Sequence, residues 1–321
     1  MAAAPTRPPR APRVLTAAVL RLADQPLAAE RDAGLAARFA ATMDTQLRVL
    51  LDQQRGVDDL GDPEAVHQMR VAIRRMRVAL RVGGIGSAGD ELRAELGWLG
   101  GELGAVRDLD VLAERLSASA AALGPADADG TGQLLAALHD ARITTRAALR
   151  SVLNADRYRT LLRALAKLVR EAPSVRPADA AEPVEPPTDP ASLLDRPLRK
   201  LRRAVAAAGS TPGDEVLHEI RIKGKRLRYA AELAIAMCER RRRKPLRRLI
   251  SSAKDLQEAL GDHHDTVTAE AWLRAHGTSL PGPAVLVAGR LLERELALRT
   301  GYEREWPQIW QELDQRARAL D

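Results

Sequence analysis

Cysteine, aromatic residues and long apolar runs are scarce in this sequence. The single cysteine, Cys238, excludes an internal disulfide and a cysteine-based zinc site, which favours a reducing compartment. No apolar run reaches the ~18 residues of a membrane-spanning helix, and prolines and arginines interrupt the N-terminal segment where a signal peptide needs an apolar core. We therefore expect a soluble cytoplasmic protein with no membrane partner.

Basic residues outnumber acidic ones. The 321 residues include 50 lysines and arginines and 43 aspartates and glutamates, a formal net charge of +7. This excess favours a polyanionic partner, although it describes attraction and not fold. Hydrophobic residues make up 45% of the chain, and its richness in alanine, leucine, arginine and glutamate favours helix over strand. We predict an all-α protein of about two domains.

The segment Glu171–Pro190 separates two helical regions. It holds six prolines and five acidic residues against one arginine, a composition that disfavours helix and predicts an extended linker. We expect a disordered or loosely ordered arm at 1–26, a first bundle at 27–170, the linker at 171–190 and a second bundle at 191–321. Six helices are expected on each side, at residues 33–55, 64–82, 88–104, 106–121, 132–152 and 155–170, and at 191–208, 214–238, 242–260, 262–275, 283–299 and 303–319.

The two regions repeat each other at two places. The stretch "VHQMRVAIRRMRVALR" at Val66–Arg81 is echoed 151 residues later, so that His67 corresponds to His218 and Arg70 to Arg221. The stretch "LGAVRDLDV" from Leu103 is echoed 157 residues later by "LGDHHDTVT", which pairs Arg107 with His264. A duplicated helical unit predicts two antiparallel bundles related by a pseudo-twofold axis.

The first repeated helix carries an apolar stripe and a basic stripe side by side. At 100° per residue, the spacing of three and four residues gives each stripe one side of the helix. The apolar stripe holds Val66, Met69, Ile73, Met76 and Leu80, and the basic stripe holds His67, Arg70, Arg74, Arg77 and Arg81. The second repeated helix places His218, Arg221, Lys225 and Arg228 beside its own apolar positions.

The basic stripes have two interpretations. Most charged helix faces are simply solvated, but such faces usually include acidic residues at i,i+4, and Val66–Arg81 has none. Like charges at that spacing disfavour the helix, so a duplicated basic stripe favours a site for negative charge. We expect the stripes to face a groove between the two halves. Proteins that bind single-stranded nucleic acids usually stack aromatic side chains on the bases. These two helices contain only one such residue, Tyr229, so a phosphate polymer without bases is the better match.

Together these two duplicated stretches resemble the CHAD family, the conserved histidine α-helical domain. The resemblance covers nearly the whole chain after about residue 30. It implies two pseudo-twofold-related antiparallel helical bundles whose basic central cavity binds inorganic polyphosphate. Members are often fused to a triphosphate-tunnel β-barrel, and we expect this chain to act without one. The positions that match the family's pattern are His67, Arg70, Arg74, Arg75, Arg77, Arg107, His218, Arg221, Lys223, Lys225, Arg226, Arg228, His263 and His264, to which the stripe adds Arg81.

Two other functions stay open at this stage. The pair His264–Asp265 superficially resembles metal-dependent phosphohydrolases, but neighbouring arginines would repel a cation. A nucleic-acid-binding module is the second alternative, although no helix-turn-helix or zinc-finger signature is present. We expect Asp108 and Asp265 to orient basic residues and not to act as general bases. The expectation is therefore a non-enzymatic protein with no cofactor and no metal, associated with polyphosphate granules.

Two details remain undecided by the sequence. Either His263 or His264 could face the ligand. The run "RRRRKPLRR" at Arg240–Arg248 is either an exposed polar turn or an outer extension of the polymer's path.

Overall fold

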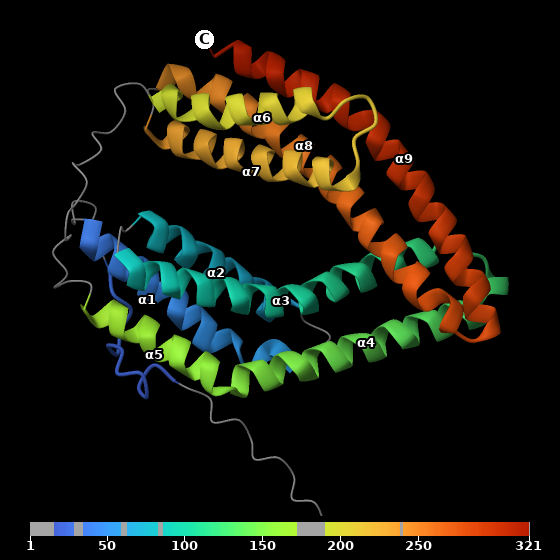
Figure 1. Cartoon of the computed structure of the whole chain (residues 1–321), viewed down its shortest axis with the longest axis horizontal. Helices are drawn as coiled ribbons and strands as arrows, with labels where there is room; N and C mark the ends of the chain where they lie inside the picture. The colour runs from blue at the N-terminus through green and yellow to red at the C-terminus, as the bar shows by residue number, and fades with distance from the viewer. Residues whose placement is uncertain are drawn as a thin grey trace, which may run out of the picture. The chain divides into compact units, whose positions relative to one another are not determined.

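The computed structural model describes residues 16–28, 35–58, 63–82, 86–171, 190–237 and 240–320. These residues form α-helices and short 3-10 helices with no strand, which confirms the predicted all-α fold (Figure 1). No helix in this part of the chain is long and apolar enough to cross a membrane. Cys238, most of the expected N-terminal arm and residues 172–189 of the expected linker lie outside the described residues.

The chain packs as two compact units. The first comprises Met1–Val111 and Leu138–Ala180, and the second comprises Leu112–Ala137 and Ala181–Asp321. The sequence-based division placed residues 112–137 in the first bundle, whereas they pack with the C-terminal helices. The reason is that buried Glu295 of the second unit accepts bonds from Arg115 and Ser119, a contact between residues about 180 positions apart.

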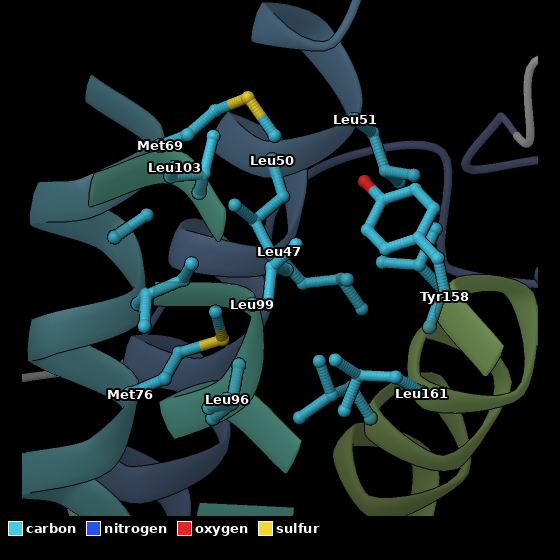
Figure 2. Packing of buried hydrophobic residues seen from close by; sticks show 14 of the residues in the cluster. Leu47, Leu50, Leu51, Met69, Met76, Leu96, Leu99, Leu103, Tyr158 and Leu161 are labelled. Atoms are coloured by element: carbon cyan, nitrogen blue, oxygen red, sulfur yellow. The ribbon is translucent and has the colours of Figure 1, made fainter. Parts of the chain in front are cut away.

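The first unit is built on helices that share one apolar core. They are α1 (Leu35–Gln53), α2 (Glu64–Val82), the first part of α3 (Gly86–Ala120), the last part of α4 (Ala128–Asn154) and α5 (Asp156–Glu171). The apolar stripe of α2 is buried as predicted, with Met69 and Met76 fully enclosed. Figure 2 shows these methionines beside leucines of α1 and α3, with Tyr158 of α5 nearby. The labelled core residues are Leu47, Leu50, Leu51, Met69, Met76, Leu96, Leu99, Leu103, Tyr158 and Leu161.

The second unit has a core of its own. Its main helices are α6 (Asp195–Ala207), α7 (Asp214–Met237), α8 (Arg240–His276) and α9 (Gly282–Arg318). The buried side of α7 holds Leu217, Ile220 and Leu227, which pack in one cluster with Leu249 and Leu256 of α8. Because these apolar positions face inward, the basic residues between them are turned toward the flank of the core.

Three of the expected helix breaks do not occur. We expected helices to end near Gly104, Gly261 and Gly301, but α3, α8 and α9 each continue through these glycines. A glycine inside a helix costs only about 1 kcal/mol relative to alanine, and the packing of a long helix outweighs that cost. The expected twelve helices therefore merge into nine α-helices within the described residues.

Candidate anion-binding faces

The basic stripe of α2 lies at the edge of the core of the first unit. Arg70 is half-buried, and His67, Arg74, Arg77 and Arg81 are exposed. None of the four arginines forms a hydrogen bond or ion pair with any other described residue. We call this stripe, together with half-buried Arg107 of α3, the first basic face. Its cations have no protein carboxylate to neutralise them within the described part of the chain.

Glycines of α3 make room for the arginines of α2. A Cβ atom added to Gly104 would lie 2.7 Å from Nη1 of Arg70, so the guanidinium occupies the space that a side chain would fill. One added to Gly97 would lie 3.6 Å from Cζ of Arg77. These two glycines were not among the residues predicted from the sequence for the site. Their spacing of seven residues, about two helical turns, places them on the same side of α3 and could have identified them.

The second unit also places an arginine over a glycine, but at ordinary contact distance. A Cβ atom on Gly261 of α8 would lie 3.7 Å from Nε of Arg221. Arg221 and Gly261 are the equivalents of Arg70 and Gly104 under the two sequence offsets, so the repeat is preserved in side-chain contacts. We call the set His218, Arg221, Lys225 and Arg228 of α7 with His264 of α8 the second basic face; all five residues are half-buried.

Two histidines meet within the second basic face. The ring centroids of His218 and His264 lie 4.9 Å apart, with the planes tilted by 50°. Burial lowers the pKa of His218, and the nearby charges of His264, Arg221 and Lys225 lower it further. Nδ1 of His218 and Nε of Arg221 are buried without a hydrogen-bond partner among the described residues. Such buried donors and acceptors are costly unless a ligand or water completes them.

A carboxylate lies beside the second basic face. Burial raises the pKa of Asp265, and the charges of Arg115, Arg221 and His264 oppose that rise. These cations therefore lie near the Asp265 carboxylate, and its role in orienting them stays a prediction. Asp108, its equivalent in the first repeat, is exposed.

Of the two adjacent histidines, only His264 joins the second basic face. His263 is buried, with Nε2 at 3.4 Å from Oε1 of Glu303 and 3.6 Å from Oδ1 of Asp214. Successive helical residues point about 100° apart, so a histidine next to one that reaches the basic face turns away from it. The prediction that His263 contacts the ligand is therefore withdrawn.

The carboxylates around His263 are already paired with the guanidinium of Arg299. One atom each of Asp214, His263 and Glu303 lie within 4.8 Å of one another, a spacing that suits a metal ion. However, the Arg299 guanidinium bonds Asp214 at 2.8 Å and Glu303 at 3.1 Å, and it also bonds Glu270 at 3.0 Å. An arginine that neutralises these carboxylates would repel a divalent ion, so the cluster is a structural ion-pair network.

Four further predicted residues are less available or lie elsewhere. Lys223 pairs with Glu219 on the same helix. Arg75 and Arg226 are exposed and lie about 120° around their helices from the basic stripes. Arg228 bonds Glu232 and the Gln257 side chain, and its guanidinium lies 4.6 Å from the Tyr229 ring centroid. The residues that the fold brings together are thus fewer than the sequence suggested.

Comparison with known proteins gives the family. The profile of the CHAD domain matches residues 41–274. The chain belongs to the CHAD family. The CHAD domain of the plant Ricinus communis has a similar structure, with a TM-score of 0.66, 28% identity, and coverage of 90% of this chain and 95% of that one.

Two other comparisons place this CHAD domain among its relatives. The fold of PptA from Streptomyces chartreusis is similar, with a TM-score of 0.61, 20% identity, and coverage of 86% of this chain and 98% of that one. The uncharacterised proteins MT2285 and Rv2226 of two Mycobacterium tuberculosis strains are each 32% identical over 275 residues, which is 79% of this chain. This chain spans about half, 49%, of the length of these curated relatives.

Proposed function

We propose that this CHAD domain binds inorganic polyphosphate through its first and second basic faces. The observation that carries the proposal is the buried pair of unsatisfied groups, Nδ1 of His218 and Nε of Arg221, beside Lys225 and His264. Phosphate oxygens would accept hydrogen bonds from these groups and neutralise the cations around them. The arginines of α2 support it, since they too lack an anionic partner among the described residues.

A phosphate polymer without bases suits these faces better than a nucleic acid. Among the residues of α2 and α7, Tyr229 alone is aromatic, and the Arg228 guanidinium already lies over its ring. Base stacking on aromatic side chains contributes about 1–3 kcal/mol per base in single-strand binders. The two helices offer no free ring of this kind, whereas they offer repeated arginines that match phosphate oxygens.

The proposed role is binding and not catalysis. Asp265, a carboxylate beside the second basic face, lies among cations that it can orient. The candidate metal ligands at Asp214, His263 and Glu303 are bonded to Arg299 or lie beside it. In a cell, a domain of this kind would attach its protein to polyphosphate, including polyphosphate granules in the cytoplasm.

The test is a calorimetric titration of the protein with polyphosphates of defined length. Two double variants remove one face each, Arg70→Ala/Arg74→Ala and Arg221→Ala/Lys225→Ala. The matched control, Arg75→Ala/Arg226→Ala, removes the same charge from exposed positions of the same two helices but outside both faces. Charge-assisted hydrogen bonds contribute about 1.5–3 kcal/mol each, so each face variant should weaken long-chain binding at least about tenfold.

The control variant should lose far less affinity, and none of the three should unfold. Because both faces belong to one polypeptide, a long chain held by one face binds the other at high effective concentration, and orthophosphate gains no such advantage. Equal losses in the control and the face variants would show that net charge alone attracts the polymer. Tighter binding of RNA than of length-matched polyphosphate, or metal-dependent release of phosphate, would replace the proposal with one of the two alternative functions.

A further inference from the structure

A further basic surface lies on α8 and α9, outside both basic faces. It is a hollow of about 490 Å³ within the second unit. Four cationic side chains and one hydroxyl line it, from Lys244, Arg247, Arg248 and Ser251 of α8 and Arg316 of α9. The run Arg240–Arg248 therefore forms the first turns of α8, so the interpretation of this run as a polar turn is wrong.

The core of the second unit fixes which side of α8 lines the hollow. Leu246, Leu249 and Ala253 are buried, and this turns the residues between them outward. Arg316 is held from the α9 side, where Nη1 donates a hydrogen bond of 3.2 Å to the Arg248 carbonyl oxygen. Its neighbours along α9, Leu313 and Ala317, are buried. The packing of α8 and α9 thus fixes the helix sides that carry these cations.

Among the residues that the structure describes, no acidic side chain lines the hollow. Arg316 pairs with exposed Glu312 on the same helix, but at a long distance of 3.9 Å. Lys244 and Arg247 form no ion pair or hydrogen bond with any other described residue. Like charges three and four residues apart disfavour a helix by a few tenths of a kcal/mol per pair. An anion in the hollow would remove that repulsion.

The hollow is distinct from the second basic face. Lys244 and His264 both belong to α8, and their separation of 20 positions corresponds to about 30 Å of helix. A ligand contact at one position therefore does not include the other unless the ligand is a long polymer. None of the described residues that line the hollow is aromatic or a large apolar residue, so they offer no ring on which a nucleobase could stack.

We propose that this hollow is a separate binding site for an inorganic oligophosphate, a short run of linked phosphates. Its volume lies within the range of small-ligand sites, about 300–1,000 Å³. Guanidinium groups bind phosphate oxygens in pairs, and the Ser251 hydroxyl adds a donor. The same site accepts a free oligophosphate or a segment of a longer chain, because both present the same oxygens.

Lysine footprinting tests this site locally, since the chain contains few lysines. The protein is acetylated with and without tripolyphosphate, and the rate at each lysine is read by mass spectrometry. Lys244 reports on the hollow, Lys225 reports on the second basic face, and exposed Lys200 of α6 is the internal control. The variant Arg247→Ala/Arg248→Ala removes two exposed lining side chains, and Arg199→Ala/Arg203→Ala removes two exposed arginines from α6.

Tripolyphosphate should protect Lys244 and not Lys200. The concentration for half-protection of Lys244 should rise at least tenfold in Arg247→Ala/Arg248→Ala and change less than twofold in the α6 variant, with unchanged thermal unfolding in both. Acetylation of Lys244 at the unprotected rate would overturn the proposal, as would equal protection in the two variants.

Two further comparisons separate this proposal from the proposed function and from nucleic acid. Protection of Lys225 without Lys244 removes the hollow and leaves the proposed function intact, and the reverse result removes the second basic face instead. A longer polyphosphate that protects Lys244 at lower phosphate concentration than tripolyphosphate identifies a polymer segment as the occupant. A duplex oligonucleotide that protects Lys244 better than either would overturn the assignment to an oligophosphate.

Discussion

The imidazole ring of His218 on α7 lies 4.9 Å from that of His264 on α8, centroid to centroid. Burial lowers the pKa of His218, and the charges of His264, Arg221 and Lys225 act in the same direction. The free protein therefore favours neutral His218. A bound polyanion favours the protonated ring, because it places negative charge beside it. Phosphate binding at the second basic face is thus linked to proton uptake.

We predict that polyphosphate affinity rises as the pH falls. In the free protein the pKa of His218 lies below its ordinary value of 6.5, and in the complex it rises, so protons are taken up at pH values between the two. Calorimetry in buffers of different ionisation enthalpy measures this uptake directly. Burial also raises the pKa of neighbouring Asp265, so the contribution of His218 must be isolated with a variant of this histidine.

The variant His218→Asn should reduce the proton uptake while the fold is kept. His139→Asn is the control, because His139 lies on α4 and not on either basic face. Proton uptake that is the same in wild type and His218→Asn would show that this histidine does not titrate with the ligand.

Replacing Gly104, which lies against the Arg70 guanidinium, should weaken ligand binding without lowering the stability of the protein. A Cβ at Gly104 would lie 2.7 Å from Nη1 of Arg70, so Gly104→Ala should displace the guanidinium and weaken polyphosphate binding severalfold. Alanine stabilises a helix interior by about 1 kcal/mol relative to glycine, so the free energy of unfolding should hold or rise. Calorimetry and urea denaturation measure the two quantities.

Two other glycines serve as matched controls for this change. An added Cβ at Gly101 meets no atom within 4 Å, and one at Gly261 would lie 3.7 Å from Nε of Arg221, an ordinary contact. Gly101→Ala and Gly261→Ala should therefore gain stability with little loss of binding. If Gly104→Ala binds as well as Gly101→Ala, the position of Arg70 over α3 does not matter for the ligand.

Local patterns predicted the helices that carry the site better than the contacts between them. The range 64–82 was predicted for α2 and is observed, because apolar residues spaced three and four positions apart without interruption are compatible only with a helix. The continuation of α8 through Gly261 was missed, because the cost of one glycine is smaller than the packing energy, which a sequence pattern does not display. His263 was misplaced for a related reason: its partner Glu303 lies on α9, 40 residues away, and periodicity along one helix carries no information about it.

Binding should weaken steeply with salt. Each phosphate that a cation neutralises releases counterions, and nucleic-acid binders with 6–10 phosphate contacts lose about 10³–10⁵ in affinity between 50 and 200 mM salt. A loss of similar order is expected for long polyphosphate. The Arg70→Ala/Arg74→Ala variant should show a shallower slope of log affinity against log salt, and Arg75→Ala/Arg226→Ala should keep more of it. A flat response in the wild type would contradict neutralisation of phosphates by either basic face.

The buried pair between Asp110 and Arg146 should stabilise the first unit. Nη1 and Nη2 of Arg146 bond the two carboxylate oxygens at 2.9 and 2.8 Å, and its Nε donates to the Val57 carbonyl at 3.1 Å. Both side chains are almost fully enclosed, at 2% and 1% exposure. Breaking a buried pair leaves one charge without its partner and costs about 3–5 kcal/mol. Arg146→Met should therefore lower the free energy of unfolding in urea denaturation, but by less than that amount, because half-buried Arg142 still bonds Oδ1 of Asp110 at 3.0 Å.

A double variant and a surface control decide whether the loss comes from the stranded charge. Replacing both partners by apolar residues of similar size often restores stability, so Asp110→Leu/Arg146→Met should recover much of the loss. Arg157→Met removes the partner of Glu95 from an exposed pair and should change stability little, because solvent screens that pair. If Arg146→Met behaves like Arg157→Met, the bond from Arg142 is enough to hold the enclosed carboxylate of Asp110, and Arg146 adds little to the stability of the first unit.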